Sequence, residues 1–314
     1  MDVLRGDTRP GDLRPSVLAL GNFDGVHRGH RALLDEALDR ARTSGLATAV
    51  AVFEPHPRRF FQPDAPPFRL MSDDRRNAIF AEMGFDRLHV LTFDADMAAR
   101  TPKAFVADIL NDRIAAREVV VGADFRFGKG RAGDFAALAE LARARGMTAH
   151  AAGLVEAGGE KISSSAIRNA VAGGDMNATE AWLGRPFILD GVVEEGDRRG
   201  RTIGFPTANV ALGDFVRPAH GVYAVSVRRP GDTQDMAGVA NVGVRPTVDG
   251  KQERLEVHLF DFAGDLYGQT LAVSFHDHLR GEKKFDGLDA LKNQIARDCE
   301  AARAVLAARE SGPA

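Results

Sequence analysis

The chain changes its hydrophobic pattern once, near residues 182–186, and this change limits the folds that it can adopt. Up to about residue 154, short apolar runs alternate with amphipathic helical stretches. This alternation is typical of a parallel sheet built from βαβ units. After the change, short β-rich runs are separated by Gly, Pro and Asp, and no helix is predicted until near the end. The sequence therefore predicts a doubly wound α/β domain over residues 1–184 and an antiparallel β-barrel with a closing helix over residues 185–314.

The individual elements follow from the apolar runs and from helix-end signals. In the first part, strands are predicted over residues 17–20, 47–53, 88–93, 119–122 and 148–154. A helix with an apolar stripe that includes Leu33 and Leu34 is expected to stop at Gly45, and another is capped by Thr101 and Pro102. In the second part, strands are predicted over residues 221–227, 236–242, 255–260 and 271–275, and a helix over residues 288–308.

Composition narrows the class of protein. With 314 residues, of which 44% are hydrophobic and 27% charged, the chain is long enough for two conventional cores. A formal net charge of −3 does not indicate a nucleic-acid or anionic-membrane partner. Cys299 is the single cysteine, which argues against a disulfide framework or a cysteine-based metal site. Because a signal peptide and a membrane-length apolar run are both absent from the sequence, we expect a soluble, cytoplasmic protein.

A glycine-rich turn follows the first of these predicted strands. Residues 21–30 read Gly-Asn-Phe-Asp-Gly-Val-His-Arg-Gly-His. A turn of this kind at a helix start presents backbone N–H groups to an anion, and His27 and His30 add two hydrogen-bond donors. Turns of this composition are also common without a ligand, and neighbouring histidines are often only surface residues. The candidate phosphate-binding residues of the turn are Gly21, Asn22, Phe23, Asp24 and Gly25.

A second short motif lies in the C-terminal part. Residues 200–209 read Gly-Arg-Thr-Ile-Gly-Phe-Pro-Thr-Ala-Asn. Thr207 and Asn209 offer hard oxygen ligands two residues apart, which suits Mg²⁺, although the same residues also form capped turns. Residues 254–260 alternate, so Glu256 and His258 are predicted on the face opposite the apolar side chains. On alternation alone, Glu256 is either a proton acceptor or an ordinary solvent-facing carboxylate.

Three further segments carry polar side chains in positions that suit a site. His56 lies in a Pro-His-Pro sequence after the second predicted strand, which is otherwise typical of a rigid loop. Residues 121–134 combine aromatic, cationic and glycine residues, which fits either a ligand-covering loop or a solvated one. Ser163–Ser165 and Arg168 lie at a predicted helix start, where hydroxyls serve as caps or bind phosphate.

Both motifs resemble one family. Residues 21–30 match, position by position, the G-x-F-D-G-x-H-x-G-H signature of the nucleotidylyltransferase half of the bacterial bifunctional riboflavin kinase/FMN adenylyltransferase (FAD synthetase) family, and residues 200–209 resemble its riboflavin kinase signature. The resemblance runs in order from about residue 17 to about residue 298. It implies a Rossmann-like N-terminal domain and two reactions: ATP phosphorylates riboflavin to FMN, and a second ATP adenylylates FMN to FAD with release of pyrophosphate. It also implies Mg²⁺ in both steps.

The resemblance assigns roles to residues of this chain. It implies that the catalytic residues are His27, His30 and Glu256. In the adenylylation site, it implies ATP binding by Gly21, Asn22, Phe23, Asp24, Gly25, Ser163, Ser164, Ser165 and Arg168, and flavin binding by His56, Asp124, Phe125, Arg126 and Phe127. In the kinase site, it implies ATP binding by Gly200, Arg201, Gly204, Pro206, Thr207 and Asn209, flavin binding by Arg280 and Glu282, and metal binding by Thr207 and Asn209.

The chain departs from the family pattern at three positions. Phe187 stands where tyrosine is frequent, Ser165 where threonine is usual, and Arg59 where an acidic residue is common. Arg59 could change the charge near the adenylylation site. Two alternatives stay open from sequence: only one half is active and the other is a flavin sensor, or the protein is a non-catalytic flavin carrier.

Overall fold

A computed structural model describes residues 1–6, 13–153, 155–157, 159–195, 204–247 and 250–311. The chain forms two compact units. Unit 1 comprises Met1–Ala65 and Asp73–Ser163, and unit 2 comprises Pro66–Ser72 and Ser164–Ala314. Compactness thus divides the chain after residue 163, whereas the predicted domain boundary at residue 184 rests on sequence pattern and stays a prediction.

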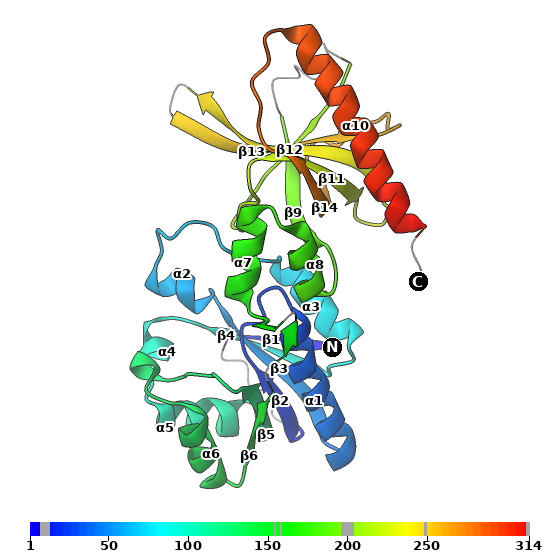
Figure 1. Cartoon of the computed structure of the whole chain (residues 1–314). Coiled ribbons are helices and arrows are strands. Elements are labelled where there is room, and N and C mark those ends of the chain that lie inside the picture. The colour runs from blue at the N-terminus through cyan, green and yellow to red at the C-terminus, as the bar shows by residue number, and fades with distance from the viewer. Residues whose placement is uncertain (7–12, 154, 158, 196–203, 248–249, 312–314) are drawn as a thin grey trace. The chain divides into compact units, whose positions relative to one another are not determined.

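Unit 1 is built on a six-stranded parallel sheet (Figure 1). Its strand order is β1-β4-β3-β2-β5-β6. The strands are β1 (Asp2–Arg5), β2 (Ser16–Leu20), β3 (Ala47–Glu54), β4 (Arg87–Thr92), β5 (Ala116–Gly122) and β6 (Thr148–Ala152). The five predicted strands are confirmed within a few residues, and β1 is an additional edge strand that pairs with β4. The doubly wound α/β prediction is therefore confirmed for this unit.

The connections of unit 1 are helical. They include α1 (Arg28–Ser44), α2 (Pro57–Phe61), α3 (Asp73–Glu82), α4 (Ala95–Ala99), α5 (Pro102–Ala104), the π-helical segment η1 (Phe105–Arg113), the single turn η2 (Lys129–Arg131) and α6 (Phe135–Arg143). Gly45 ends α1 with a left-handed conformation, φ 68°, as predicted. Thr101 caps α5 through its side chain, also as predicted. A short hairpin of β7 (Glu156–Ala157) and β8 (Glu160–Lys161) follows β6.

The strand order places a switch point beside β2. From β2 the chain continues to β3 on one side, and later returns to β5 on the other side. In doubly wound sheets, ligands bind in the crevice outside the carboxyl ends of the strands at this point. The turn after β2 and the loop after β5 both leave the sheet there. The sheet topology therefore brings two of the predicted site segments together.

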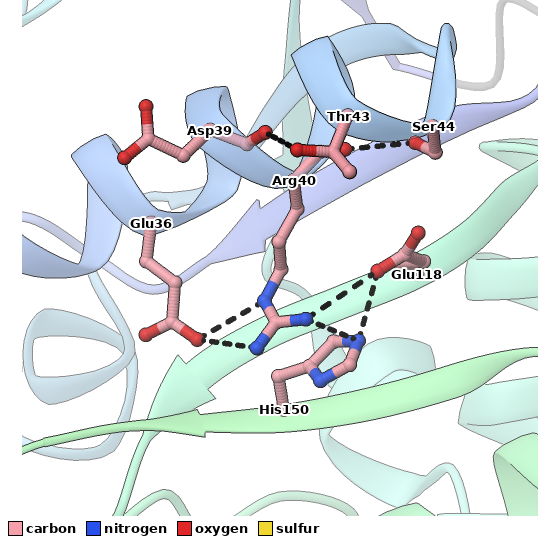
Figure 2. Close-up of polar contacts among 7 residues, drawn as sticks. All are labelled: Glu36, Asp39, Arg40, Thr43, Ser44, Glu118 and His150. Carbon is pink, nitrogen blue, oxygen red and sulfur yellow. Dashed lines mark hydrogen bonds and ion pairs between the residues drawn. The ribbon is translucent and has the colours of Figure 1, made fainter.

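A polar cluster ties α1 to the β5–β6 side of the same sheet (Figure 2). The Arg40 guanidinium donates to Glu36 Oε1 at 2.9 and 3.0 Å and lies 3.9 Å from Glu118 Oε2 on β5. The Nε2 atom of His150 on β6 is 2.9 Å from the same Glu118 oxygen and 3.3 Å from Arg40 Nη1. These contacts join α1 to β5 and β6. None of the four residues is a predicted site residue.

Unit 2 begins with two helices and continues as a closed antiparallel barrel (Figure 1). The helices are α7 (Ser164–Gly173) and α8 (Met176–Leu183), and the closing helix is α10 (Leu288–Glu310). The barrel strands are β9 (Phe187–Glu194), β10 (Ala208–Val210), β11 (Gly221–Arg228), β12 (Met236–Thr247), β13 (Gly250–Leu259) and β14 (Thr270–Arg280), in the order β10-β13-β12-β11-β14-β9 with β9 pairing β10. The predicted barrel and closing helix are confirmed.

The barrel has a packed interior and an outer face that α10 covers in part. Leu255 and Val257 of β13 point inward and are fully buried, as the predicted alternation requires. On the outer face, Val222 and Val239 pack with Ala302 of α10 in one cluster. Among the described residues of the whole chain, none of the helices has the length and apolarity needed to span a bilayer.

Candidate active sites

The histidine turn, residues 21–30, forms a compact unit at the end of β2. His27 is the N-cap of α1, and its Nδ1 accepts a hydrogen bond from the His30 backbone N–H at 3.2 Å. The two imidazoles stack with ring centroids 3.5 Å apart and an angle of 16° between the rings. The two rings therefore lie together at the start of α1. Because Nδ1 of His27 accepts the cap bond, a phosphate contact from this ring would use Nε2.

The backbone of the turn has positive φ angles at a glycine and at an aromatic residue. Gly25 has φ 90°, and Phe23 has φ 53°, which is unusual for a residue with a side chain. A Cβ atom on Gly29 would lie 3.2 Å from the His27 ring, so a glycine there leaves room for the stacked histidines. The Phe23 ring in turn meets the His30 ring edge-on at a centroid distance of 5.4 Å. Glycine and aromatic packing together hold the histidines at the helix start.

Two polar side chains of the turn are withdrawn from solvent. Asp24 is 4% exposed, and Asn22 is half-buried. The amide oxygen of Asn22 is buried without a hydrogen-bond partner among the residues that the structure describes. A buried polar atom without a partner costs about 1–3 kcal/mol, so it favours a site that a ligand completes.

A second turn, at the end of β3, carries His56 and opens onto aromatic side chains. His56 is the N-cap of α2, with Nδ1 accepting from the Arg58 backbone N–H at 3.1 Å. Phe60, Phe61 and Phe93 contact one another edge-on, with centroids 5.2 to 5.7 Å apart. Phe61 is 65% exposed, which is unusual for so large an apolar side chain. Sequence patterns do not reveal this aromatic cluster, because Phe60 and Phe61 lie on α2 whereas Phe93 follows β4.

The basic side chain that departs from the family pattern has backbone partners. Arg59 Nη1 donates to the carbonyl oxygens of Pro63 at 2.8 Å and Ala65 at 2.6 Å. The guanidinium therefore closes the loop after α2. This contact fixes where the positive charge of Arg59 lies relative to its own loop.

The loop after β5 divides its candidate residues between the surface and the core. Phe125 is half-buried and stacks on Phe127 at 5.6 Å, whereas Phe127 is 6% exposed and belongs to the core of unit 1. A Cβ on Gly133 would meet the Phe127 ring at 2.6 Å, so this glycine permits the close packing. Arg126 is exposed and lies 3.6 Å from Asp134.

Asp124 stands first in that loop. Its carboxylate accepts a hydrogen bond from Lys161 Nζ on β8 at 2.7 Å. This bond is the main reason that the pKa of Asp124 lies below its usual value. Asp124 is therefore negatively charged at neutral pH. It would repel a phosphate group rather than bind it directly. As a carboxylate, it accepts hydrogen bonds from donors, as it does from Lys161.

The serine run spans the division between the two units. Ser163 ends unit 1, and Ser164 and Ser165 begin α7 in unit 2. Within unit 1, the carbonyl oxygen of the preceding Ile162 lies 3.7 Å from the ideal Cβ position of Gly29 in the histidine turn. Within unit 2, Arg168 donates from Nε to the carbonyl oxygen of Phe68 at 2.7 Å and lies over the Phe68 ring.

Three of the candidate residues of unit 2, Asn209, Glu256 and Arg280, lie in one row across neighbouring strands. Asn209 on β10 is directly opposite Glu256 on β13, and Glu256 is opposite Asn241 on β12. Asn241 is opposite Val222 on β11, which is opposite Arg280 on β14. Residues directly opposite one another share a face, so this row lies on the outer face of the barrel. Asn209, Glu256 and Arg280, far apart in sequence, are thus brought onto one surface.

His258, which is not among the candidate site residues, holds the segment that contains Thr207 near this row. The ring nitrogen Nδ1 of His258 is 2.8 Å from the carbonyl oxygen of Pro206. His258 lies two residues after Glu256 and therefore on the same face of β13. The bond anchors the segment before Asn209 to the strand that carries Glu256. The side-chain oxygen of Asn209 is buried without a hydrogen-bond partner within the described ranges.

A pocket opens on the opposite side of the same segment. Pro206, Thr207 and Ala208 form one wall. The remaining lining residues are Val193, Val257, Leu259, Phe262, Gly264, Asp265, Leu266 and Tyr267. Val257 and Leu259 point to the barrel interior, so the pocket lies on the inner side of the strand that carries Glu256 outward. Residues 206–209 therefore separate an apolar pocket from a polar outer row.

Arg280 and Glu282 differ in how firmly the fold holds them. Arg280 makes a forked ion pair with the buried Asp298 of α10, with nitrogen–oxygen distances of 2.7 to 3.1 Å. The Glu282 carboxylate lies over Gly243, where a Cβ atom would be 2.5 Å from Oε1, and is 4.0 Å from His220 Nδ1. Gly204 is exposed. Gly200 and Arg201 lie outside the described residues.

The chemistry available at the two sites follows from these groups. The turn after β2 offers backbone N–H groups and two imidazoles, which suit phosphate oxygens. The outer row offers one carboxylate beside amide oxygens, which suits proton acceptance and a hard cation. A cluster of three or more His, Cys, Asp or Glu side chains that could hold a metal ion is not found in the described part of the chain.

Two family models match the chain, one for each sequence signature. The FAD synthetase model matches residues 9–166, and the riboflavin kinase model matches residues 183–306. Together they cover most of the chain in the order that the motifs predict. The resemblance drawn from residues 21–30 and 200–209 is therefore confirmed.

Curated relatives agree with this assignment over nearly their full length. Bifunctional riboflavin kinase/FMN adenylyltransferases from Escherichia coli K12 and Pseudomonas fluorescens are each 45% identical, covering 90% and 98% of both chains, respectively. The protein of that name from Bacillus subtilis is 37% identical over 90% of both chains.

A solved structure gives the same overall relationship. A crystal structure described as a macrolide-efflux protein from Streptococcus pneumoniae is 32% identical, covers 96% of this chain and 99% of its own, and has a TM-score of 0.86. Its description names another activity, whereas the relatives of higher identity share one description. On the two family models and these relatives, the chain belongs to the bifunctional riboflavin kinase/FMN adenylyltransferase family.

Proposed function

We propose that this chain makes FAD from riboflavin in two steps, one in each family-model region. In the riboflavin kinase region, ATP phosphorylates riboflavin, which gives FMN and ADP. In the FAD synthetase region, AMP passes from a second ATP to the FMN phosphate, which gives FAD and pyrophosphate. The matches of both family models in one chain support this pair of reactions.

In the kinase step, Glu256 is the proposed general base. Its carboxylate accepts the proton of the terminal ribityl hydroxyl as that oxygen attacks the γ-phosphorus of ATP. The row on the outer face supports this role, because it sets Glu256 directly opposite Asn209. The flavin is proposed to lie on this outer face, near Glu282. Since Arg280 is bound to Asp298, we propose that its contact with flavin is made by a guanidinium already fixed in place.

The nucleotide of the kinase step is proposed to occupy the pocket behind residues 206–209. Its apolar walls, including Leu266 and Tyr267, suit an adenine ring, and Thr207 and Pro206 lie between this pocket and Glu256. Gly200, Arg201 and Gly204 are proposed to contact the phosphates. Phosphates that cross the segment would approach Glu256 from the side that carries Asn209.

Mg²⁺ is proposed at Thr207 and Asn209. The amide oxygen of Asn209, buried and without a hydrogen-bond partner among the described residues, and the hydroxyl of Thr207 are hard donors that fit this ion. When bound, the ion would neutralise negative charge on the nucleotide phosphates.

In the adenylylation step, the histidine turn is proposed to bind ATP. His27 and His30 donate to the α-phosphate region, where negative charge increases as pyrophosphate leaves, and the N–H groups of residues 21–25 assist them. Ser163, Ser164, Ser165 and Arg168 are proposed to contact the triphosphate. The stacked geometry of the two rings supports their action on one group.

FMN is proposed to lie between the His56 turn and the loop after β5. The aromatic cluster of Phe60, Phe61 and Phe93, in which Phe61 is exposed, offers apolar ring contacts for the isoalloxazine ring. Asp124, Phe125 and Arg126 are proposed contacts from the other loop, whereas Phe127 supports Phe125 from the core.

The use of ATP and the single cysteine also favour a cytoplasmic location.

The single observation that carries the proposal is the direct opposition of Glu256 and Asn209 within a chain that both family models match. The test incubates the purified chain with riboflavin, ATP and Mg²⁺ and follows flavins by chromatography. We expect FMN to rise before FAD. If FMN accumulates and no FAD forms, the proposed adenylylation site is inactive and would serve as a flavin sensor. If riboflavin is not consumed, the result favours a non-catalytic flavin carrier.

A further inference from the structure

Helix α3 makes a buried ion pair with the end of β3. The Arg76 side chain on this helix is 1% exposed, and its guanidinium donates to the Glu54 carboxylate. Arg76 also lies 3.0 Å from Asp73 Oδ1 and 3.3 Å from Asn77 Oδ1. Glu54 is the last residue of β3 and stands two positions before His56. The buried charge pair therefore holds the strand end from which the His56 turn departs.

The same helix supports the histidine turn. Phe80 lies one helical turn after Arg76, so both side chains share one face of α3. The Phe80 ring meets the Phe23 ring edge-on at a centroid distance of 5.6 Å, and Phe23 meets His30 in the same manner. Phe23 keeps its positive φ while packed between these rings and Gly21. Phe80 is thus the core-side support of the residue that contacts His30.

The two turns that α3 contacts leave adjacent strands. β2 and β3 are paired and parallel, with Leu20 opposite Ala51, and the Gly21 N–H donates to the Ala51 carbonyl oxygen at 3.2 Å. The strand ladder fixes the turns at their starting points only. Beyond those points, the contacts of Arg76 and Phe80 restrict where each turn can go.

We propose that Arg76 and Phe80 are positioning residues for FMN adenylylation: α3 sets the spacing between the histidine turn and the His56 turn. This inference rests on the proposed function. The spacing between the two turns aligns the FMN phosphate with the α-phosphorus of ATP. Arg76 acts on the flavin side through Glu54, and Phe80 acts on the nucleotide side through Phe23. Neither side chain touches a substrate, because both are buried beneath the turns.

The two residues are expected to separate kinetically. In the full-length chain, Arg76→Met removes the buried charge that pairs with Glu54 and leaves the exposed Arg5, 3.5 Å from the other carboxylate oxygen. Phe80→Leu replaces the ring that contacts Phe23 with a smaller side chain. A misplacement of about 1 Å can reduce a rate by roughly 10²-fold, so effects of about 10-fold or more are expected here. Arg76→Met should mainly raise KM for FMN, and Phe80→Leu should mainly lower kcat.

Three comparisons make this test specific to position. Arg40→Met is the matched control, since Arg40 is also an ion-paired arginine of unit 1 but contacts Glu36, Glu118 and His150 instead (Figure 2). Arg76→Lys restores a charge for Glu54 and should recover most of the KM. Riboflavin phosphorylation, measured on the same samples, reports whether the rest of the chain is folded.

The outcomes separate the proposal from the function on which it rests. A KM for FMN that is unchanged in Arg76→Met, or equally changed in Arg40→Met, would overturn the positioning role. If Arg76→Met is too unstable to assay, Glu54→Gln replaces it, and the same rise in KM is required. If His30→Ala retains full FAD formation, the proposed adenylylation site itself fails, whatever the Arg76 variants show.

Discussion

At the scale of single residues, the side chains proposed as catalytic are held by neighbours that are fixed in the fold. His27 is oriented by the helix cap that it forms, and His30 by the Phe23 ring. Glu256 is held by strand pairing on both sides. Removing the reactive group while leaving its support therefore tests chemistry rather than folding.

Replacement of His30 by alanine tests the histidine turn. His30→Ala removes one of the two stacked rings, so we expect FAD formation from FMN to be abolished and FMN formation from riboflavin to be largely retained. Chromatography of flavins after incubation with riboflavin, ATP and Mg²⁺ measures both. His150→Ala, which removes an imidazole on β6, serves as the control. Equal loss of both activities would contradict two separate sites.

Replacement of Glu256 by glutamine tests the proposed base. Glu256→Gln keeps size but loses basicity, and we expect FMN formation to slow by roughly 10²- to 10⁴-fold. Adenylylation of supplied FMN should persist. Glu253→Gln alters an exposed glutamate of the same strand, paired with Arg217, and should leave kcat near that of the parent chain. If Glu256→Gln also stopped adenylylation, Glu256 would be structural.

The sequence indicates candidate reactive residues more readily than the residues that support them. His27, His30, Asn209 and Glu256 lie in short motifs that resemble one family, and it is this resemblance that indicates their roles, which stay predictions. The ion pair of Arg280 with Asp298 and the bond from His258 to Pro206 join positions 18 and 52 residues apart. Contacts of this kind depend on the tertiary fold, which single-sequence patterns do not report.

At the scale of elements, β4 places polar side chains inside the sheet of unit 1. Arg87 is 6% and His89 is 2% exposed, and both point to the face that packs η1. Burial lowers the pKa of His89 to about 4, with Arg87 and Arg113 adding repulsion. The folded strand therefore holds a neutral imidazole at neutral pH.

This buried histidine predicts acid sensitivity. Between pH 6.5 and about 4, the unfolded chain binds a proton that folded His89 does not, so stability falls as pH falls through this window. At 1.36 kcal/mol per pKa unit, the loss is up to about 3 kcal/mol. His89→Leu should flatten the dependence of Tm on pH, measured by thermal unfolding. Parallel curves for the two proteins would contradict the assignment.

The elements that sequence patterns missed have physical reasons. β1 is four residues long, has two apolar side chains and is a strand only because it pairs with β4. The segment predicted as part of an α-helix after Thr101 continues as the π-helical η1, which its apolar spacing does not distinguish from an α-helix. The predicted strand at residues 148–154 ends at Ala152.

At the scale of the whole molecule, the chain joins a producer of FMN to a consumer of FMN. The two family models match separate stretches, residues 9–166 and 183–306. Each proposed base or phosphate-binding group lies within one stretch, except Arg168, which lies between the two. The proposed reactions therefore need FMN to move from one site to the other.

A mixing experiment tests this independence. Neither His30→Ala nor Glu256→Gln should make appreciable FAD from riboflavin alone, but an equal mixture should do so after a lag. The reason is that the first variant supplies FMN and the second adenylylates it. Chromatography over time, with each variant alone as the control, measures the effect. No FAD in the mixture would mean that both sites must be intact in the same molecule.

The opposition of Asn209 and Glu256 across paired strands also limits how this half can change by insertion and deletion. Adding or removing one residue within β13 would turn Glu256 toward the interior and bring Leu255 or Val257 to the surface. A change of two residues would keep the carboxylate outside but move it along the strand, away from Asn209. Length variation in such a protein is therefore expected in the turns between strands, and hardly ever within β13 itself.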